Sequence, residues 1–249
     1  MRIILYFSVL VSNLIVQQFH AQTKIPVDDF KKVIISPHIE TKFVQGDENS
    51  VTILSSTESE DKINIKVKGK TLRVYLDDAK EWTKGKKVKK ENMKMKMPIY
   101  KGKVLTILVT YINLKSLSVR GEQRTLCESL IKGEKFKLNI YGESEVAFND
   151  VELDKLDVDI FGESNFTILD GKIDFQKITV YGESKINLMA VENKASKLKA
   201  FGEAEFEVNV SERIKFTAYG EAILRHKGGA EVSKGLSIGD SEIISINLP

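Results

Sequence analysis

The sequence predicts an all-β fold, a single-chain parallel β-helix or solenoid with coils of about 20 residues. Three observations support this prediction. A motif of Gly, an acidic residue and a small or polar residue recurs at intervals of 18 to 21 residues. Apolar and polar residues alternate on both sides of each motif, which is typical of strands with one buried face. No proline occurs between Ile99 and Leu248, as expected where nearly every backbone N–H takes part in strand pairing.

The recurring motif, here called the corner motif, marks a turn between two strands of each coil. Its glycines are Gly121, Gly142, Gly162, Gly182, Gly202, Gly220 and Gly239. Glycine adopts positive φ without a steric penalty, which suits a sharp corner. A coil this short has no room for a helix, so neighbouring coils should pair in parallel, about 4.8 Å apart.

The positions expected to point inward lie four and two residues before each glycine, and four and six residues after it. They are Leu117, Val119, Leu138, Ile140, Val158, Ile160, Ile178, Val180, Leu198, Ala200, Phe216 and Ala218 before the corners, and Val146, Phe148, Phe166, Ile168, Ile186, Leu188, Phe206, Val208 and Leu224 after them. Cys127 and His226 occupy the sixth position in their coils, so we expect both to fill the core. A lone cysteine excludes an internal disulfide.

The N-terminus has the pattern of a secretory signal peptide. Met1-Arg2 precede an apolar run from Ile3 to Val16, and Ala21 is a plausible cleavage site. We therefore divide the chain into a signal peptide (1–21), a short leader (22–29) and a β-helical domain (30–249). The apolar run is too short for a stable membrane span, so the mature chain is expected to lack one. The predicted location is the periplasm, the cell surface or the medium.

The alternation of apolar and polar residues in 30–79 predicts a looser coil of the same solenoid. Residues 80–103 interrupt this pattern. This insertion holds ten lysines and two glutamates, although the whole chain carries a net charge of only +3. We expect contact with a polyanion such as acidic polysaccharide or lipid headgroups, through Lys84, Lys86, Lys87, Lys89, Lys90, Lys94 and Lys96. The alternative is a solvated excursion without a ligand. Nucleic acid is not expected as a partner, because the chain is exported and interleaved aromatics are lacking.

An aromatic residue precedes the glycine in five consecutive coils. These residues, here called the aromatic column, are Tyr141, Phe161, Tyr181, Phe201 and Tyr219. Strand alternation points them outward, so coil stacking should align them in one exposed stripe. Three interpretations remain open: rings stacked on one another, a homo-oligomer or partner interface, and a groove that binds glycans by sugar stacking.

The second residue of the corner motif forms a parallel acidic column. Its members are Glu122, Glu143, Glu163, Glu183, Glu203, Glu221 and Asp240. We expect these carboxylates to be solvated, with Ca²⁺ on Glu143, Glu163, Glu183 and Glu203 as an alternative. No other cofactor and no catalytic residue is predicted, since the acids are equivalent from coil to coil and His38 and His226 lie far apart in sequence.

The order of several segments resembles an exported bacterial family, the putative auto-transporter adhesin head GIN domain. The resemblance covers about residues 30–245 and rests on segments 30–34, 44–53, 67–72 and 114–121, and on Gly220-Glu221-Ala222 running towards Gly228. It implies a right-handed β-helical fold, an envelope or surface location and no transferable catalytic residues. We therefore predict a non-enzymatic, adhesin-like binding or structural module. The alternative is a polysaccharide-active enzyme of the lyase or hydrolase type on a β-helical fold.

Overall fold

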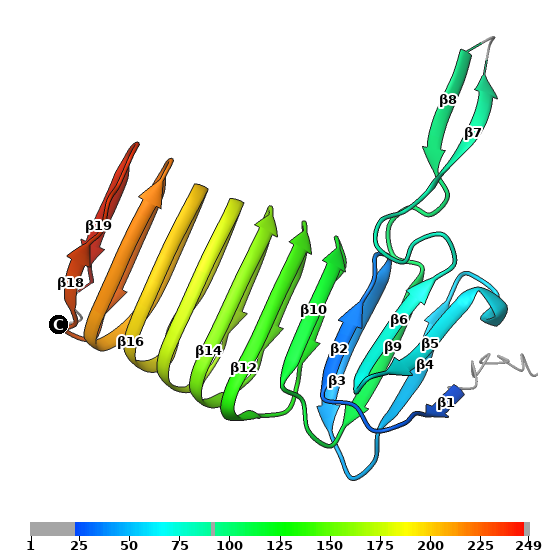
Figure 1. Ribbon diagram of the computed structural model, residues 1–249, viewed down its shortest axis with the longest axis horizontal. Coiled ribbons are helices and arrows are strands. Elements are labelled where there is room, and N and C mark those ends of the chain that lie inside the picture. Colours follow the sequence, from blue (N-terminus) through cyan, green and yellow to red (C-terminus); the bar gives the residue numbers. More distant parts are fainter. Residues whose placement is uncertain (1–22, 91–92, 247–249) are drawn as a thin grey trace, which may run out of the picture.

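The computed structural model describes residues 23–246 except 91 and 92, and it is an all-β solenoid (Figure 1). The predicted signal peptide lies outside the described residues. From β10 (Ser116–Gly121) onwards the strands stack side by side along the long axis of the molecule (Figure 1). Neighbouring coils pair in parallel with the glycines aligned: β12 (Ile131–Gly142) pairs with β14 (Val151–Gly162) so that Gly142 lies opposite Gly162. The predicted fold class and coil register are confirmed.

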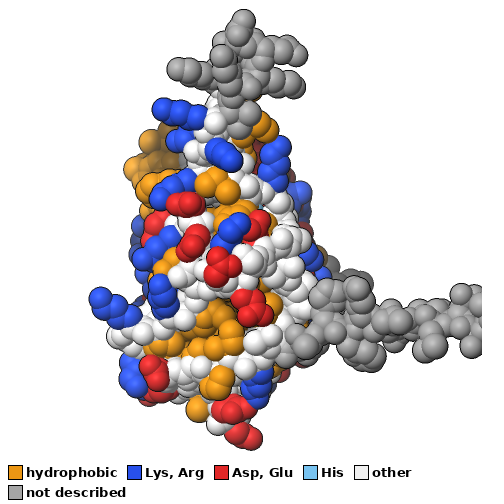
Figure 2. Space-filling view, turned by 90° about the vertical axis from the view of Figure 1, so that its right-hand side faces the viewer, with side chains coloured by type: hydrophobic (Ala, Val, Ile, Leu, Met, Phe, Trp, Pro, Cys, Tyr) orange, Lys and Arg blue, Asp and Glu red, His pale blue; other side chains and the backbone are white. Residues whose placement is uncertain are grey.

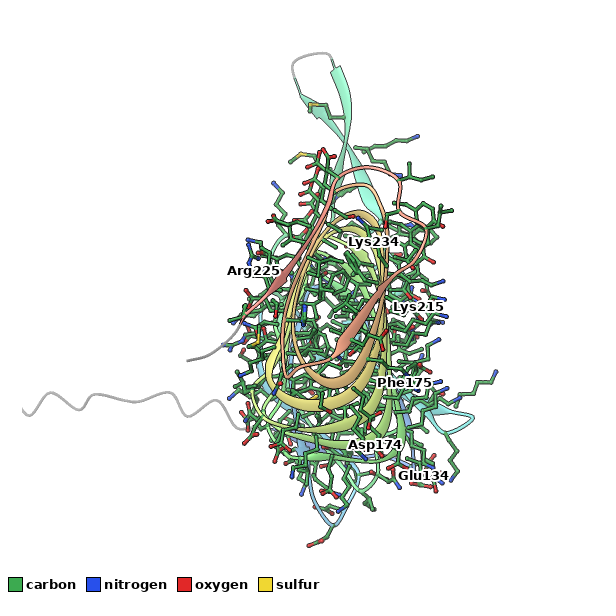
Figure 3. All side chains as sticks on the ribbon, turned by 90° about the vertical axis from the view of Figure 1, so that its left-hand side faces the viewer. Glu134, Asp174, Phe175, Lys215, Arg225 and Lys234 are labelled. Atoms are coloured by element: carbon green, nitrogen blue, oxygen red, sulfur yellow. The ribbon has the colours of Figure 1, made fainter. Side chains whose placement is uncertain are left out.

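The remaining strands of the repeated part follow the corner motifs. They are β10 (Ser116–Gly121), β11 (Thr125–Cys127), β13 (Glu145–Phe148), β15 (Ser164–Ile168), β16 (Gly171–Tyr219), β17 (Ala222–Lys227), β18 (Glu231–Lys234) and β19 (Ser241–Ser245). Strand β16 is long because backbone pairing continues around the corners of successive coils. Viewed along the axis, each coil is a flattened loop, and Lys215 and Arg225 lie on its opposite long faces (Figure 3).

The interior of the coils is apolar, as the alternation predicts. All the residues assigned inward positions are buried, including Val158 and Ile160 with 1% and 0% exposure. Cys127 is fully buried, and burial raises the pKa of its thiol, which is therefore a small core residue and not a reactive thiol. His226 is 7% exposed and fills its coil as expected.

The corner glycines are required by the geometry of stacking. Gly162 has a φ of +124°, and a Cβ added there would lie 2.3 Å from the carbonyl oxygen of Gly142 in the preceding coil. Glycine is thus needed for its backbone conformation and for the close approach of two coils.

The N-terminal part belongs to the same solenoid, but its coils are not stacked in sequence order. Strands β2 (Lys32–Ile35) and β3 (Ile39–Gln45) form one coil, which pairs in parallel with β10 and β11. On the other side of this coil lie β6 (Thr71–Leu76) and β9 (Leu105–Tyr111), also parallel to it. The outermost coil is therefore built from β6 and β9, which come later in the chain than the coil they cover.

Antiparallel strands close this end of the solenoid. Strand β4 (Ser50–Ser56) pairs with β9 and with β1 (Thr23–Pro26), and β5 (Ile63–Lys68) pairs with β6. A 3₁₀ turn, η1 (Glu60–Lys62), precedes β5. The segment expected as a leader thus contributes a strand to the cap. No helix in the described part of the chain is long and apolar enough to cross a membrane.

Candidate functional site

The lysine-rich insertion forms a β-hairpin that stands away from the solenoid (Figure 1). Its strands, β7 (Gly85–Lys90) and β8 (Met93–Pro98), pair with each other as a separate two-stranded sheet. The hairpin connects β6 with β9, at the point where the later coils carry the corner motif. It is therefore an enlarged corner of the outermost coil, and it lies at the N-terminal end of the aromatic and acidic columns.

The two legs of the hairpin are fixed to the body of the protein. His38 bridges them, because its Nδ1 lies 2.6 Å from the Gly102 carbonyl oxygen and its Nε2 lies 2.6 Å from the Thr83 hydroxyl. Tyr100 is 5% exposed and belongs to the core. The insertion predicted at 80–103 is therefore not wholly an excursion, because its legs are packed and hydrogen-bonded and only the paired strands project.

Glu81 adds an ionic contact at the root. Its carboxylate pairs with the guanidinium groups of both Arg73 and Arg120. Partial burial lowers the pKa of both arginines. The Arg120 guanidinium also lies 5.2 Å from the ring centroid of Tyr141, the first member of the aromatic column. One chain of contacts thus links the hairpin root to the column.

A cavity of about 420 Å³ lies at this junction, with His38, Glu81, Trp82, Arg120 and Tyr141 among its lining residues. Trp82, the single tryptophan of the chain, is 73% exposed there. The sequence analysis did not find this cavity. Its residues come from four segments that are distant in sequence, and no local pattern indicates that the fold brings them together.

The pairing register of the hairpin sorts the lysines expected to contact a polyanion. In the backbone register Lys87 lies opposite Lys96, and Lys89 lies opposite Lys94. In the alternate pairs of the register, Lys86 lies opposite Met97 and Lys90 lies opposite Met93. The side chains of Lys86, Lys87 and Lys96 are exposed. The Lys84 ammonium lies 2.8 Å from an Asp78 carboxylate oxygen at the root, and this contact raises the pKa of Lys84.

The aromatic column points outward and its rings stack on one another. Successive ring centroids are 4.8 to 5.1 Å apart, with interplanar angles of 3° to 6°. Tyr141, Phe161 and Tyr181 are 37% to 41% exposed. Each inner ring is covered by neighbours on both faces, so solvent meets ring edges. The geometry favours self-stacking over sugar stacking, because a sugar would have to separate two rings. An oligomer or partner interface formed by the ring edges stays a prediction.

The acidic column is exposed along its whole length. It borders a groove of about 680 Å³, whose lining includes Glu163, Glu183, Glu203, Glu221 and Asp240. Among the described residues, no three His, Cys, Asp or Glu side chains are grouped so that they could hold a metal ion. Binding of Ca²⁺ by Glu143, Glu163, Glu183 and Glu203 stays a prediction, which a calcium titration of the protein would test.

The third residue of the corner motif has a structural role that the sequence analysis missed. The Ser164 hydroxyl donates to the Gly142 carbonyl oxygen at 2.9 Å and accepts from the Ser144 N–H at 3.1 Å. Ser184 makes the same two contacts one coil further on. These serines are 1% to 6% exposed. Strand alternation could have predicted their inward position, because they lie two residues before an inward side chain.

The fold places this chain among the parallel β-solenoid proteins. A family model described as "putative auto-transporter adhesin, head GIN domain" matches residues 29–230. The chain belongs to this family, as its sequence resemblance predicted. No curated protein matches it.

Solved structures of similar fold cover most of the chain. A putative adhesin from Bacteroides fragilis has a TM-score of 0.71 at 20% identity, covering 90% of this chain and 96% of its own. A putative adhesin from Parabacteroides merdae has a TM-score of 0.65 at 17% identity, covering 91% and 96%. A putative lipid binding protein from Parabacteroides distasonis has a TM-score of 0.63 at 19% identity, covering 91% and 96%. At these identities the likeness establishes the fold.

Proposed function

We propose that this protein is an exported, non-enzymatic, adhesin-like binding module of the bacterial cell envelope, in which the solenoid holds the lysine hairpin out to a polyanion. The observation that carries the proposal is the hairpin itself. Its strands pair with each other and project from the body, and its register sets lysine opposite lysine in two pairs. The family description and the names of the similar structures support a binding role at the surface.

Electrostatics explains why such an arm favours an anionic partner. Like charges directly opposite each other destabilise an antiparallel pair. The pairs Lys87–Lys96 and Lys89–Lys94 therefore destabilise the hairpin. A bound polyanion would neutralise these charges and stabilise the paired strands. Two-stranded sheets are marginal on their own, so the partner would also help to order the arm.

A non-enzymatic role is supported by the contacts of His38 and Glu81 at the hairpin root, because these contacts are structural. Both ring nitrogens of His38 have hydrogen-bond partners, and the Glu81 carboxylate is paired with two arginines. These groups hold the hairpin in place. The acidic column, in turn, repeats the same exposed carboxylate in each coil, whereas glycoside hydrolysis needs two carboxyl groups with different roles. The envelope location rests on the signal-like sequence at 1–21 and on the family.

Heparin chromatography of the chain from Gln22 onwards tests the proposal. Replacing Lys87 and Lys96 with glutamine should make the protein elute at distinctly lower salt, because two lysines of the arm are lost. The matched control is Lys197→Gln with Lys199→Gln, which removes the same charge from the solenoid face. Equal losses in both variants would contradict a role for the hairpin, and so would a parent protein that heparin does not retain.

A further inference from the structure

We propose that the partner of the hairpin is an anionic lipid bilayer, and that the methionine face of the hairpin enters the boundary between headgroups and acyl chains. This inference rests on the proposed function, because it takes the hairpin as the contact arm. It goes further by naming a lipid surface in place of a polysaccharide. Lysines alone suit either partner, so the apolar residues of the arm decide between them.

The two faces of the hairpin differ in character. One face carries Lys87 opposite Lys96, whereas the other carries Met97 opposite Lys86, with Met95 two residues further along the same strand. Met95 is 50% exposed and Met97 is 40% exposed. Methionine side chains held in water on a projecting arm are a liability unless a partner covers them, and flexible thioethers adapt well to an irregular apolar surface. A soluble polysaccharide offers no comparable apolar surface to cover these methionine side chains.

Further apolar side chains continue this surface towards the root. Ile99 is 43% exposed and Trp82 is 73% exposed, one on each leg of the hairpin. Tryptophan is enriched at membrane–water interfaces, where its ring is apolar and its N–H stays hydrated. The end view shows Lys and Arg side chains beside hydrophobic ones on the body below the arm, with Asp and Glu side chains among them (Figure 2). On the arm itself, exposed lysines such as Lys87 and Lys96 accompany exposed Met95 and Met97, and this combination of cationic and apolar side chains is typical of interfacial membrane-binding elements.

The acidic column begins at the hairpin root, where Glu122 lines the cavity. Its further members lie on coils that stack away from the hairpin along the long axis of the molecule (Figure 1). Two coil spacings of about 4.8 Å already exceed the Debye length of about 8 Å at physiological ionic strength. The repulsion between most of this column and anionic lipid at the hairpin is therefore screened, while the hairpin lysines reach the surface. Each lysine near such a surface strengthens binding about fivefold.

Vesicle flotation of the chain from Gln22 onwards tests the inference. The vesicles are phosphatidylcholine alone and phosphatidylcholine with phosphatidylglycerol at about 30%. The parent should float with the anionic vesicles and bind neutral ones far more weakly. Met95→Ser with Met97→Ser should weaken flotation about tenfold, because the apolar contact is lost, and should leave heparin elution unchanged. Lys87→Gln with Lys96→Gln should weaken vesicle binding roughly 25-fold and also lower heparin retention.

Leu169→Ser is the matched apolar control, since Leu169 is 57% exposed on the solenoid. It should float like the parent. A probe of depth is Met95→Trp in a Trp82→Phe background, whose single tryptophan should shift to shorter emission wavelength with anionic vesicles and not with heparin.

The outcomes separate this inference from the proposed function. If the methionine variant floats like the parent, or if Leu169→Ser weakens flotation equally, insertion is overturned while retention on heparin leaves the polyanion role standing. Equal binding to neutral and anionic vesicles would overturn the role of charge in lipid binding. A parent that neither floats nor is retained by heparin would overturn both.

Discussion

Replacing Gly162 with alanine should destabilise the solenoid by about 3–5 kcal/mol. Gly162 has a φ of +124°, and the new Cβ would lie 2.3 Å from the Gly142 carbonyl oxygen. A non-glycine residue in such a conformation costs roughly 1–3 kcal/mol. The same oxygen accepts hydrogen bonds from the Glu163 N–H at 3.0 Å and the Ser164 hydroxyl at 2.9 Å. Moving it away from the methyl group stretches both bonds, each worth about 1 kcal/mol.

Gly69→Ala is the matched control for this experiment. Gly69 also has a positive φ, +57°, but a Cβ there would meet nothing within 4 Å. Its replacement should therefore cost only the conformational strain, about 1–2 kcal/mol. Equilibrium unfolding in guanidinium chloride, followed by far-ultraviolet circular dichroism, gives both free energies of unfolding. If Gly162→Ala loses no more stability than Gly69→Ala, the close approach of neighbouring coils is not what requires glycine at the corners.

Three further predictions follow from the core, the aromatic column and a buried histidine. Val158→Asp should unfold the domain in a circular dichroism melt, because an unpaired carboxylate at a site with 1% exposure costs several kcal/mol; a parent-like melt would contradict the inward assignment. Tyr181→Ser with Phe201→Ser removes three stacking contacts and should cost roughly 2–4 kcal/mol in a denaturant titration. If the column is an oligomer interface, light scattering should also show a smaller particle, whereas unchanged stability and mass would leave the column without either role. Burial lowers the pKa of His226, so the unfolded chain binds more protons than the native one as pH falls below about 6.5 and the parent loses stability there. His226→Val, which copies Val208 of the preceding coil, should reduce the loss of melting temperature between about pH 7.5 and about pH 5; an unchanged loss would mean that His226 is not its source.

Much of the repeated part could be predicted from local pattern. Strand residues alternate between two faces, so the position of a residue relative to the corner glycine determines whether it is buried. This rule places Val158 in the core and Tyr181 outside, and the structure agrees. The aromatic and acidic columns follow from the same rule, because residues one period apart align when coils stack. Composition alone also marked the hairpin as basic.

Other features depended on contacts between distant segments. The sequence showed that aromatic rings align but not that they stack face to face, which covers both faces of each inner ring. It marked residues 80–103 as one insertion, whereas the structure packs Tyr100 into the core and leaves Met95 exposed on a separate sheet.

What the sequence by itself determined is the coil: its length, its corner and its buried face. Each of these depends on residues within about 20 positions of one another, and strand geometry converts that spacing into direction. What only the tertiary structure decided is the order of the coils at the N-terminal end, and with it the place of the hairpin. The coil of β6 and β9 covers that of β2 and β3 by pairing across a long separation in sequence. Many apolar strands of similar pattern can pair in parallel, so the periodicity of the sequence does not specify which two strands become neighbours. That choice depends on packing of the whole core, and it puts the hairpin at the end of the aromatic column.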